Sequence, residues 1–190
     1  MTREAVLALF RTSGALLDGH FRLTSGLHSP GYLQCALVLQ HPPHAESLGR
    51  AIAERTRAWQ PTVVLSPALG GVVIGHEVAR ALGVRAIFAE RQDGALTLRR
   101  GFTVEADDRV LVVEDVLTTG GSTRETMDVA ANAGAHVVGA TSVVDRSGGT
   151  VRFDVPYVAL LDYPLPTYQV DACPLCAQGT PAIKPGSRSS

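Results

Sequence analysis

The chain has 190 residues, 17 basic and 18 acidic side chains and a net charge of −1; 45% of its residues are hydrophobic and 5% aromatic. This length and apolar content suffice for one large domain, or for a domain with a small appendage. The near-zero charge excludes a global field that attracts nucleic acid or membrane, and the few aromatics disfavour a stacking platform for single-stranded bases. Three cysteines, an odd number, argue against a disulfide framework.

The N-terminal segment is predicted to be an amphipathic helix over residues 2–12, with Thr2 as N-cap and Gly14 as the stop. Glu4 interrupts its apolar residues and no cleavage-like site follows, so we do not interpret it as a signal peptide. No run approaches the roughly 18–20 apolar residues that span a bilayer. We therefore expect a cytoplasmic protein without membrane or nucleic-acid partners.

The next segment, residues 19–32, is dense in turn formers and hydroxyls. Short hairpin-like strands are expected over Phe21–Thr24 and Tyr32–Leu39. Pro42 and Pro43 then break the chain, and residues 44–58 have the apolar spacing of a helix with Leu48 and Ile52 inward.

From Thr62 onward the sequence repeats a strand–turn–helix rhythm. Helices are expected up to about Leu82 and over 122–133, a polar irregular segment over 90–103, and strands over 62–65, 84–89, 109–114, 136–144 and 155–161. This alternation predicts a parallel sheet, which binds ligands beyond the carboxyl ends of its strands. Three turns should therefore meet in one crevice: 66–71, 114–122 and 145–149.

The most informative stretch is 110–123, Val-Leu-Val-Val-Glu-Asp-Val-Leu-Thr-Thr-Gly-Gly-Ser-Thr. A short buried strand ends in two carboxylates, Glu114 and Asp115, and a turn rich in glycine and hydroxyls opens a helix. Backbone N–H groups in such a turn bind phosphate, whereas carboxylates suit sugar hydroxyls. The spacing predicts a ribose 5-phosphate site, and it matches neither the nucleoside triphosphate nor the dinucleotide glycine motif.

The same stretch closely resembles the phosphoribosyl pyrophosphate (PRPP) signature of type I phosphoribosyltransferases. A second stretch, Phe21-Arg-Leu-Thr-Ser-Gly-Leu-His-Ser-Pro-Gly-Tyr32, resembles the N-terminal segment of orotate phosphoribosyltransferases, where it forms part of a hood over the base. The resemblance implies an α/β, type I phosphoribosyltransferase fold: a central parallel sheet flanked by helices, with a small N-terminal hood. It divides the chain into the N-terminal helix and hood (1–40), the core (41–170) and a tail (171–190).

The resemblance also implies an activity, transfer of phosphoribose from PRPP to orotate in pyrimidine nucleotide synthesis, with Mg²⁺ as cofactor and a homodimer as the assembly. Glu114 and Asp115 would bind the ribose hydroxyls, and Arg146 the orotate. The 5-phosphate would lie against the turn made of Val116, Leu117, Thr118, Thr119, Gly120, Gly121 and Ser122, with Thr118 also beside the orotate. The chemistry needs no nucleophile, and we assign no catalytic side chain.

The chain departs from the family pattern at three places. Leu69 and Gly70 stand where relatives often have a tyrosine–lysine pair, and Thr24 where many have lysine. Over 88–103, a mobile catalytic loop in relatives, Arg91 matches a basic PRPP-binding position, but the later lysine and histidine have no counterpart. Arg99 and Arg100 are either pyrophosphate contacts or a solvated turn.

The histidines show no metal-ligand spacing, and no metal site is assigned. Cys173-Pro-Leu-Cys176 supplies half of a tetrahedral zinc site, so it either pairs with a second subunit or holds reduced structural thiols, the favoured interpretation. Lys184, the only lysine, is interpreted as a solvated tail residue. Two alternatives stay open: a purine phosphoribosyltransferase, and a nucleotide-sensing RNA-binding regulator on the same fold.

Overall fold

The centre of the molecule is a six-stranded sheet in the order β5-β4-β3-β6-β7-β8, seen in a computed structural model that describes residues 1–23 and 26–184. All neighbouring strands are parallel except the edge strand β5, which is antiparallel to β4. The strands are β3 (Val63–Pro67), β4 (Arg85–Gln92), β5 (Ala95–Leu98), β6 (Arg109–Leu117), β7 (His136–Asp145) and β8 (Tyr157–Asp162).

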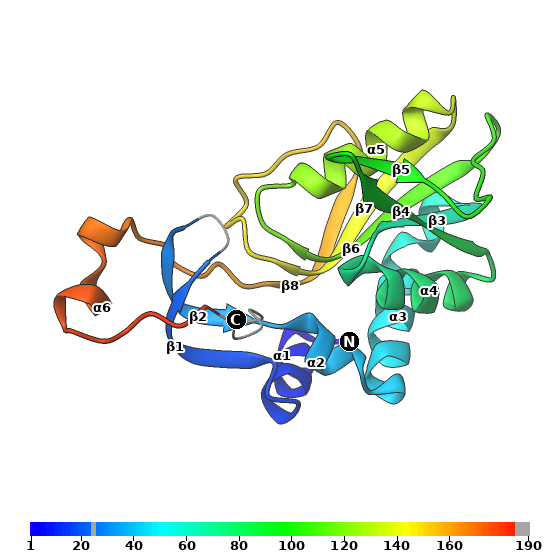
Figure 1. Ribbon diagram of the computed structural model, residues 1–190. Helices are drawn as coiled ribbons and strands as arrows, with labels where there is room; N and C mark the ends of the chain where they lie inside the picture. The colour runs from blue at the N-terminus through cyan, green and yellow to red at the C-terminus, as the bar shows by residue number, and fades with distance from the viewer. Residues whose placement is uncertain (24–25, 185–190) are drawn as a thin grey trace.

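Helices cover both faces of this sheet (Figure 1). One face carries α1 (Arg3–Thr12), α2 (Cys35–Leu39), α3 (Pro42–Thr56) and α4 (Gly70–Leu82), and the other carries α5 (Gly121–Asn132). A 3-10 turn, η1 (Arg57–Trp59), follows α3.

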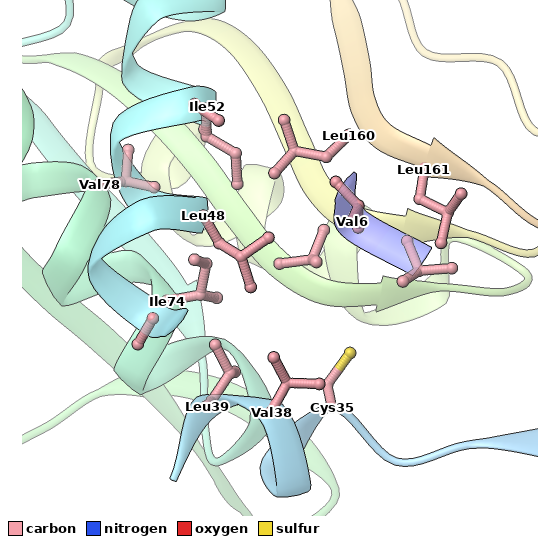
Figure 2. Packing of buried hydrophobic residues seen from close by; sticks show 14 of the residues in the cluster. Val6, Cys35, Val38, Leu39, Leu48, Ile52, Ile74, Val78, Leu160 and Leu161 are labelled. Atoms are coloured by element: carbon pink, nitrogen blue, oxygen red, sulfur yellow. The ribbon is translucent and has the colours of Figure 1, made fainter. Parts of the chain in front are cut away.

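The core follows from the two-residue period of β6. Leu111 and Val113 face the α1–α4 layer, whereas Val110 and Val112 face the α5 layer, and all four are fully buried. Figure 2 shows the first layer, where Leu48 and Ile52 of α3 point toward side chains of α4 and β8. A strand that is apolar on both faces fits only the middle of a covered sheet, so β6 and the turn after it are held rigidly.

A two-stranded hairpin lies apart from the main sheet. It pairs β1 (Leu16–Arg22) with β2 (His28–Leu33) in antiparallel register. The C-terminal segment, with η2 (Val170–Ala172) and α6 (Pro174–Ala177), lies beside this hairpin at the far end of the molecule from α3 and α4 (Figure 1).

The expected parallel sheet flanked by helices is confirmed. Thr2 caps α1 by accepting a hydrogen bond from the Ala5 N–H, 3.3 Å away, and Gly83 ends α4 with φ of 78°. The turns after β3, β6 and β7 follow the carboxyl ends of adjacent parallel strands, as the sequence predicted.

Three local expectations were wrong. Residues 35–39 form helix α2 rather than a strand, since a short apolar run fits either structure and this one packs between α1 and α3. Pro42 opens α3 instead of breaking the chain, because proline fits the first helical position. Residues 90–98 are not irregular: β4 runs to Gln92 and turns into β5 through Asp93 and Gly94, both with positive φ.

The remaining boundaries shift by a few residues. The first hairpin strand spans Leu16–Arg22 rather than Phe21–Thr24, and Thr24 lies outside the described residues. The proposed division at residues 40 and 170 stays a prediction. No helix in the described part of the chain is long and apolar enough to cross a membrane.

Candidate active site

A cavity of about 560 Å³ opens at the carboxyl ends of β6 and β7. One wall comes from the β6 turn and the loop after β7, and the other comes from the hairpin and the segment after β8. Its lining residues are Leu23, Leu27, Tyr32, Leu33, Gln34, Cys35, Asp115, Val116, Thr118, Thr119, Arg146, Ser147, Thr150, Leu165 and Thr167. We call it the large cavity.

A second, small cavity of about 40 Å³ lies inside the turn itself. Its lining is Glu114 together with the continuous stretch Val116–Thr123. Gly120, with φ of 78°, is the N-cap of α5, so the free backbone N–H groups of the first helical turn surround this space. Such a helix N-terminus stabilises an anion. Val116, Thr118 and Thr119 line both cavities, which places an anion site directly beside the larger space.

The paired carboxylates differ in their surroundings. Glu114 is 9% exposed and accepts a hydrogen bond from the Thr123 hydroxyl at 3.3 Å, whereas Asp115 faces the large cavity. Burial, and then the charge of Asp115, raises the pKa of Glu114 to about 8, and burial also raises the pKa of Asp115. The pair is thus costly to ionise without a ligand and is ready to accept hydrogen bonds from one.

Arg146 enters the large cavity because of the β6–β7 ladder. Leu117 pairs with Asp145 at the end of that ladder, and the Arg146 N–H donates to the Leu117 carbonyl at 2.8 Å. The guanidinium is half-buried, its Nε lacks a hydrogen-bond partner, and burial lowers its pKa. A buried cation with an unsatisfied donor is costly; a planar anion in the cavity would satisfy it.

The turn after β3 reaches the same place from the other side. Leu69 and Gly70 share a groove of about 330 Å³ with Gln34, Gln40, Val73 and Asp115. Asp115 therefore borders both this groove and the large cavity. The three turns that were expected to meet, 66–71, 114–122 and 145–149, do so around this carboxylate.

Arg91 in β4 and Arg100 after β5 lie in ion pairs. Arg91, assigned to PRPP, pairs with Glu125 of α5 at 2.9 Å and lines none of the three cavities. Arg100 binds Glu90 with two hydrogen bonds, 2.7 and 2.9 Å. A PRPP contact from Arg91 requires that its ion pair open, and that role stays a prediction.

Several lining residues escaped the sequence reasoning. Gln34, Leu165 and Thr167 belong to no motif and come from segments after β2 and β8. The close packing of these segments, where a β-carbon on Gly31 would lie 2.9 Å from Leu165 Cδ2, is a tertiary fact with no local sequence signal.

Comparison with known proteins agrees with this geometry. The phosphoribosyl transferase domain model matches residues 36–164. The chain therefore belongs to the phosphoribosyl transferase family, as its signature predicted. Over its full length, the chain is 55% identical to the orotate phosphoribosyltransferase of Pelotomaculum thermopropionicum, covering 99% of both chains. It is 54% identical to that of Heliobacterium modesticaldum, with complete coverage of both. Within the family, the chain groups with the orotate phosphoribosyltransferases.

Solved structures show the same fold. The orotate phosphoribosyltransferase of Mycobacterium tuberculosis, in complex with Fe(III) dicitrate, superposes with a TM-score of 0.70 at 26% identity, covering 84% of this chain and 95% of that one. The adenine phosphoribosyltransferase of Thermoanaerobacter pseudethanolicus has a TM-score of 0.62 at 15% identity, with 70% and 88% covered, and shares the fold alone. The expected type I phosphoribosyltransferase fold is confirmed.

Proposed function

We propose that this protein transfers the 5-phosphoribosyl group of PRPP to orotate, giving orotidine 5′-monophosphate and pyrophosphate in pyrimidine nucleotide synthesis. The observation that carries the choice of acceptor is Arg146, whose half-buried guanidinium has an Nε without a hydrogen-bond partner and lies beside the anion-binding turn. Orotate is a pyrimidine with a carboxylate, which a guanidinium binds with two parallel hydrogen bonds. The full-length relatives support the same reaction.

The phosphate, ribose and base fit side by side along the two adjoining cavities. The 5-phosphate occupies the turn of Val116–Ser122, and the ribose hydroxyls donate to Glu114 and Asp115. The base then lies in the large cavity between Thr118 and Arg146, where the leucines of the hairpin tip cover it. A ring nitrogen of orotate attacks the anomeric carbon of the ribose as pyrophosphate leaves. The chain contributes orientation and the exclusion of water, which would otherwise hydrolyse PRPP.

Mg²⁺ is the proposed cofactor. It prefers oxygen ligands and keeps only one or two protein carboxylates alongside substrate phosphates. Asp115 lies between the large cavity and the groove, and Glu114 precedes it in the chain. The carboxylate oxygens of both residues are suitable ligands for the ion. When bound together with pyrophosphate, the ion would neutralise the charge of the leaving group.

A homodimer is the proposed assembly. Leu69 is 85% exposed and Val73 46% exposed, and both border the groove beside Asp115. Two exposed aliphatic side chains at a site rim are of the kind that a second subunit covers. We also propose a cytoplasmic location, because none of the three cysteines forms a disulfide, as a reducing compartment favours.

A substrate panel tests the reaction. Purified protein with Mg²⁺ and PRPP is offered orotate, uracil, hypoxanthine, xanthine and adenine in turn. We expect PRPP-dependent consumption of orotate alone. Consumption of a purine but not orotate would establish the purine-transferase alternative, and tight RNA binding without turnover would establish the regulator.

A further inference from the structure

Four potential metal ligands meet outside the active site. His20 lies on β1, His28 begins β2, and Cys173 and Cys176 lie on the C-terminal segment. Their ligand atoms are all within 4.8 Å of one another. Cys176 and His28 are 148 residues apart in the chain, so the sequence spacing alone gave no reason to connect them.

The C-terminal segment, residues 166–184, packs on this cluster and has no apolar core of its own. His20, His28 and Cys173 are at most 5% exposed, and Cys176 is half-buried. Between residues 166 and 184, all of which the structure describes, Cys173 is the only buried residue. Neither hydrophobic cluster of the described residues extends past Leu165. Small units without an apolar core usually depend on a disulfide or a metal.

Backbone hydrogen bonds hold the segment at both sides of the hairpin. Tyr168 and His28 exchange two of them, at 2.8 and 2.9 Å. Ile183 donates to the His20 carbonyl and accepts from the Arg22 N–H, both at 2.8 Å. The loop between Tyr168 and Ile183 thus leaves and rejoins the hairpin (Figure 1). It carries both cysteines, whose sulfurs lie against His20 and His28.

The distances are close to those around a tetrahedral ion. Bond lengths of about 2.3 Å to sulfur and about 2.0 Å to nitrogen imply ligand atoms roughly 3.3–3.8 Å apart. Cys176 Sγ is 3.2 Å from His28 Nδ1, and Cys173 Sγ is 3.5 Å from His20 Nε2. The two nitrogens are 2.7 Å apart, so one ring must shift by roughly 0.6 Å to admit the ion.

Hydrogen bonds to backbone carbonyls already orient the ligands. His20 Nδ1–H donates to the Thr180 carbonyl at 2.7 Å, which leaves the Nε2 lone pair facing the cluster. Pro174 opens α6 directly after Cys173, and the Ala177 N–H donates to the Cys173 carbonyl at 3.1 Å. This tight turn presents both sulfurs to one side, as Cys-x-x-Cys does in zinc sites.

We propose that His20 Nε2, His28 Nδ1, Cys173 Sγ and Cys176 Sγ bind one Zn²⁺ per chain. Both thiols give up their protons to solvent, and the two thiolates balance the charge of the ion. Two sulfur and two nitrogen ligands select zinc over Mg²⁺. Four protein ligands leave no open position, and none of the four lines a cavity described above, so the site is structural.

The zinc would fasten the wall of the large cavity. Leu23 and Leu27 at the hairpin tip, and Leu165 and Thr167 before the cysteine loop, all line that cavity. His20 and His28 flank the two leucines in the chain, and Cys173 follows soon after Thr167. The inference does not depend on which base the enzyme uses.

Metal analysis of tag-free protein, purified under reducing conditions and desalted, tests the proposal. We expect one zinc per chain in the wild type and none in the Cys173→Ser/Cys176→Ser variant. Cys35→Ala, at the remaining cysteine, and His136→Ala, at an exposed histidine, are the matched controls and should retain zinc. A wild type without zinc, even after incubation with Zn²⁺, would overturn the proposal, as would a Cys173–Cys176 disulfide.

Cobalt gives a readout that does not require the variant to fold. Wild-type protein stripped with a chelator and reloaded with Co²⁺ should show the strong visible bands of a tetrahedral ion and a thiolate-to-cobalt band in the near ultraviolet. Weak octahedral bands without the thiolate band would contradict the ligand set. Neither measurement involves orotate or PRPP, so failure here and failure of the proposed reaction are distinguishable.

Discussion

A β-carbon placed on Gly70 would lie 2.5 Å from Oδ1 of Asp115, closer than any side chain tolerates. The turn after β3 and the carboxylate after β6 are therefore in direct contact, and glycine is the residue that permits it. The family resemblance places a lysine at this position in many relatives. In this chain, the backbone of the turn takes the space that a side chain would need.

Gly70→Ala should consequently displace Asp115. We expect the KM for PRPP to rise by roughly tenfold or more, in line with the 1–3 kcal/mol cost typical of overpacking, with less effect on the KM for orotate. Steady-state kinetics with each substrate varied measures both. His76→Ala, at an exposed position on the same helix, is the control. An unchanged KM for PRPP would mean that Asp115 does not bind the ribose.

Arg146→Ala should weaken orotate binding far more than PRPP binding. Losing one partner of a buried charge pair costs about 2–5 kcal/mol, which corresponds to roughly 30-fold or more in affinity. Arg146→Lys should be intermediate, because it retains the charge but not the planar fork. Arg152→Ala, on the same loop and exposed, is the comparison. Equal losses for both substrates would contradict the assigned role.

The buried Glu114 should make stability depend on pH. Its folded pKa of about 8 exceeds its ordinary value of 4.5, so the folded state retains a proton that the unfolded state has lost. The resulting contribution of Glu114 to the free energy of unfolding is complete below about pH 4.5 and is lost as the pH rises through 8. In the wild type, the free energy of unfolding should therefore fall by roughly 2–5 kcal/mol over this pH range, at about 1.4 kcal/mol per pKa unit. Glu114→Gln should remove this decline.

Urea unfolding at a series of pH values checks this dependence. Glu54→Gln, at an exposed position on α3, should keep the wild-type profile. If the wild type and Glu114→Gln decline in parallel, Glu114 is ionised in the free protein and the burial argument is wrong.

Substituting each member of the Arg91–Glu125 ion pair distinguishes two possible roles of Arg91. If Arg91 binds PRPP, Arg91→Ala should raise the KM for PRPP several-fold, while Glu125→Ala should leave it unchanged or lower it by releasing the arginine. If Arg91 only holds the hairpin to α5, both substitutions remove the same contact and should have the same small effect. The comparison uses one kinetic assay.

Zinc removal should loosen the C-terminal segment without unfolding the sheet. The amides of Tyr168 and Ile183, which donate to the hairpin, should exchange with deuterium faster after chelation. The amide of Val112 in the central strand should not change. Exchange followed by mass spectrometry reports both; unaltered exchange at Tyr168 and Ile183 would mean that the backbone bonds alone secure the segment.

The sequence predicted the parts of this molecule whose signals are local. The apolar run 110–113, the carboxylates after it and the glycine-rich turn follow one another in the chain, and so the candidate anion site is predicted without knowledge of the fold. The Asp93-Gly94 turn is an equally local signal, but the polar residues around it favoured an irregular segment.

Other features depend on tertiary contacts that no short pattern encodes. The segment Cys35–Leu39 has the composition of a strand but packs as a helix between α1 and α3. Arg146 was found only through family resemblance, since its position in the cavity depends on the register of β6 with β7. The meeting of His20 and His28 with the two late cysteines depends on the path of the chain after β8.

Cys35 differs from the other two cysteines in a way that is useful at the bench. It is 1% exposed; burial, and then the charges of Asp115 and Glu114, raise the pKa of its thiol. A protonated, buried thiol is a poor nucleophile. An alkylating reagent applied to the native protein should therefore spare Cys35. Labelling of Cys173, itself only 3% exposed, and of Cys176 would then report that the C-terminal segment has opened.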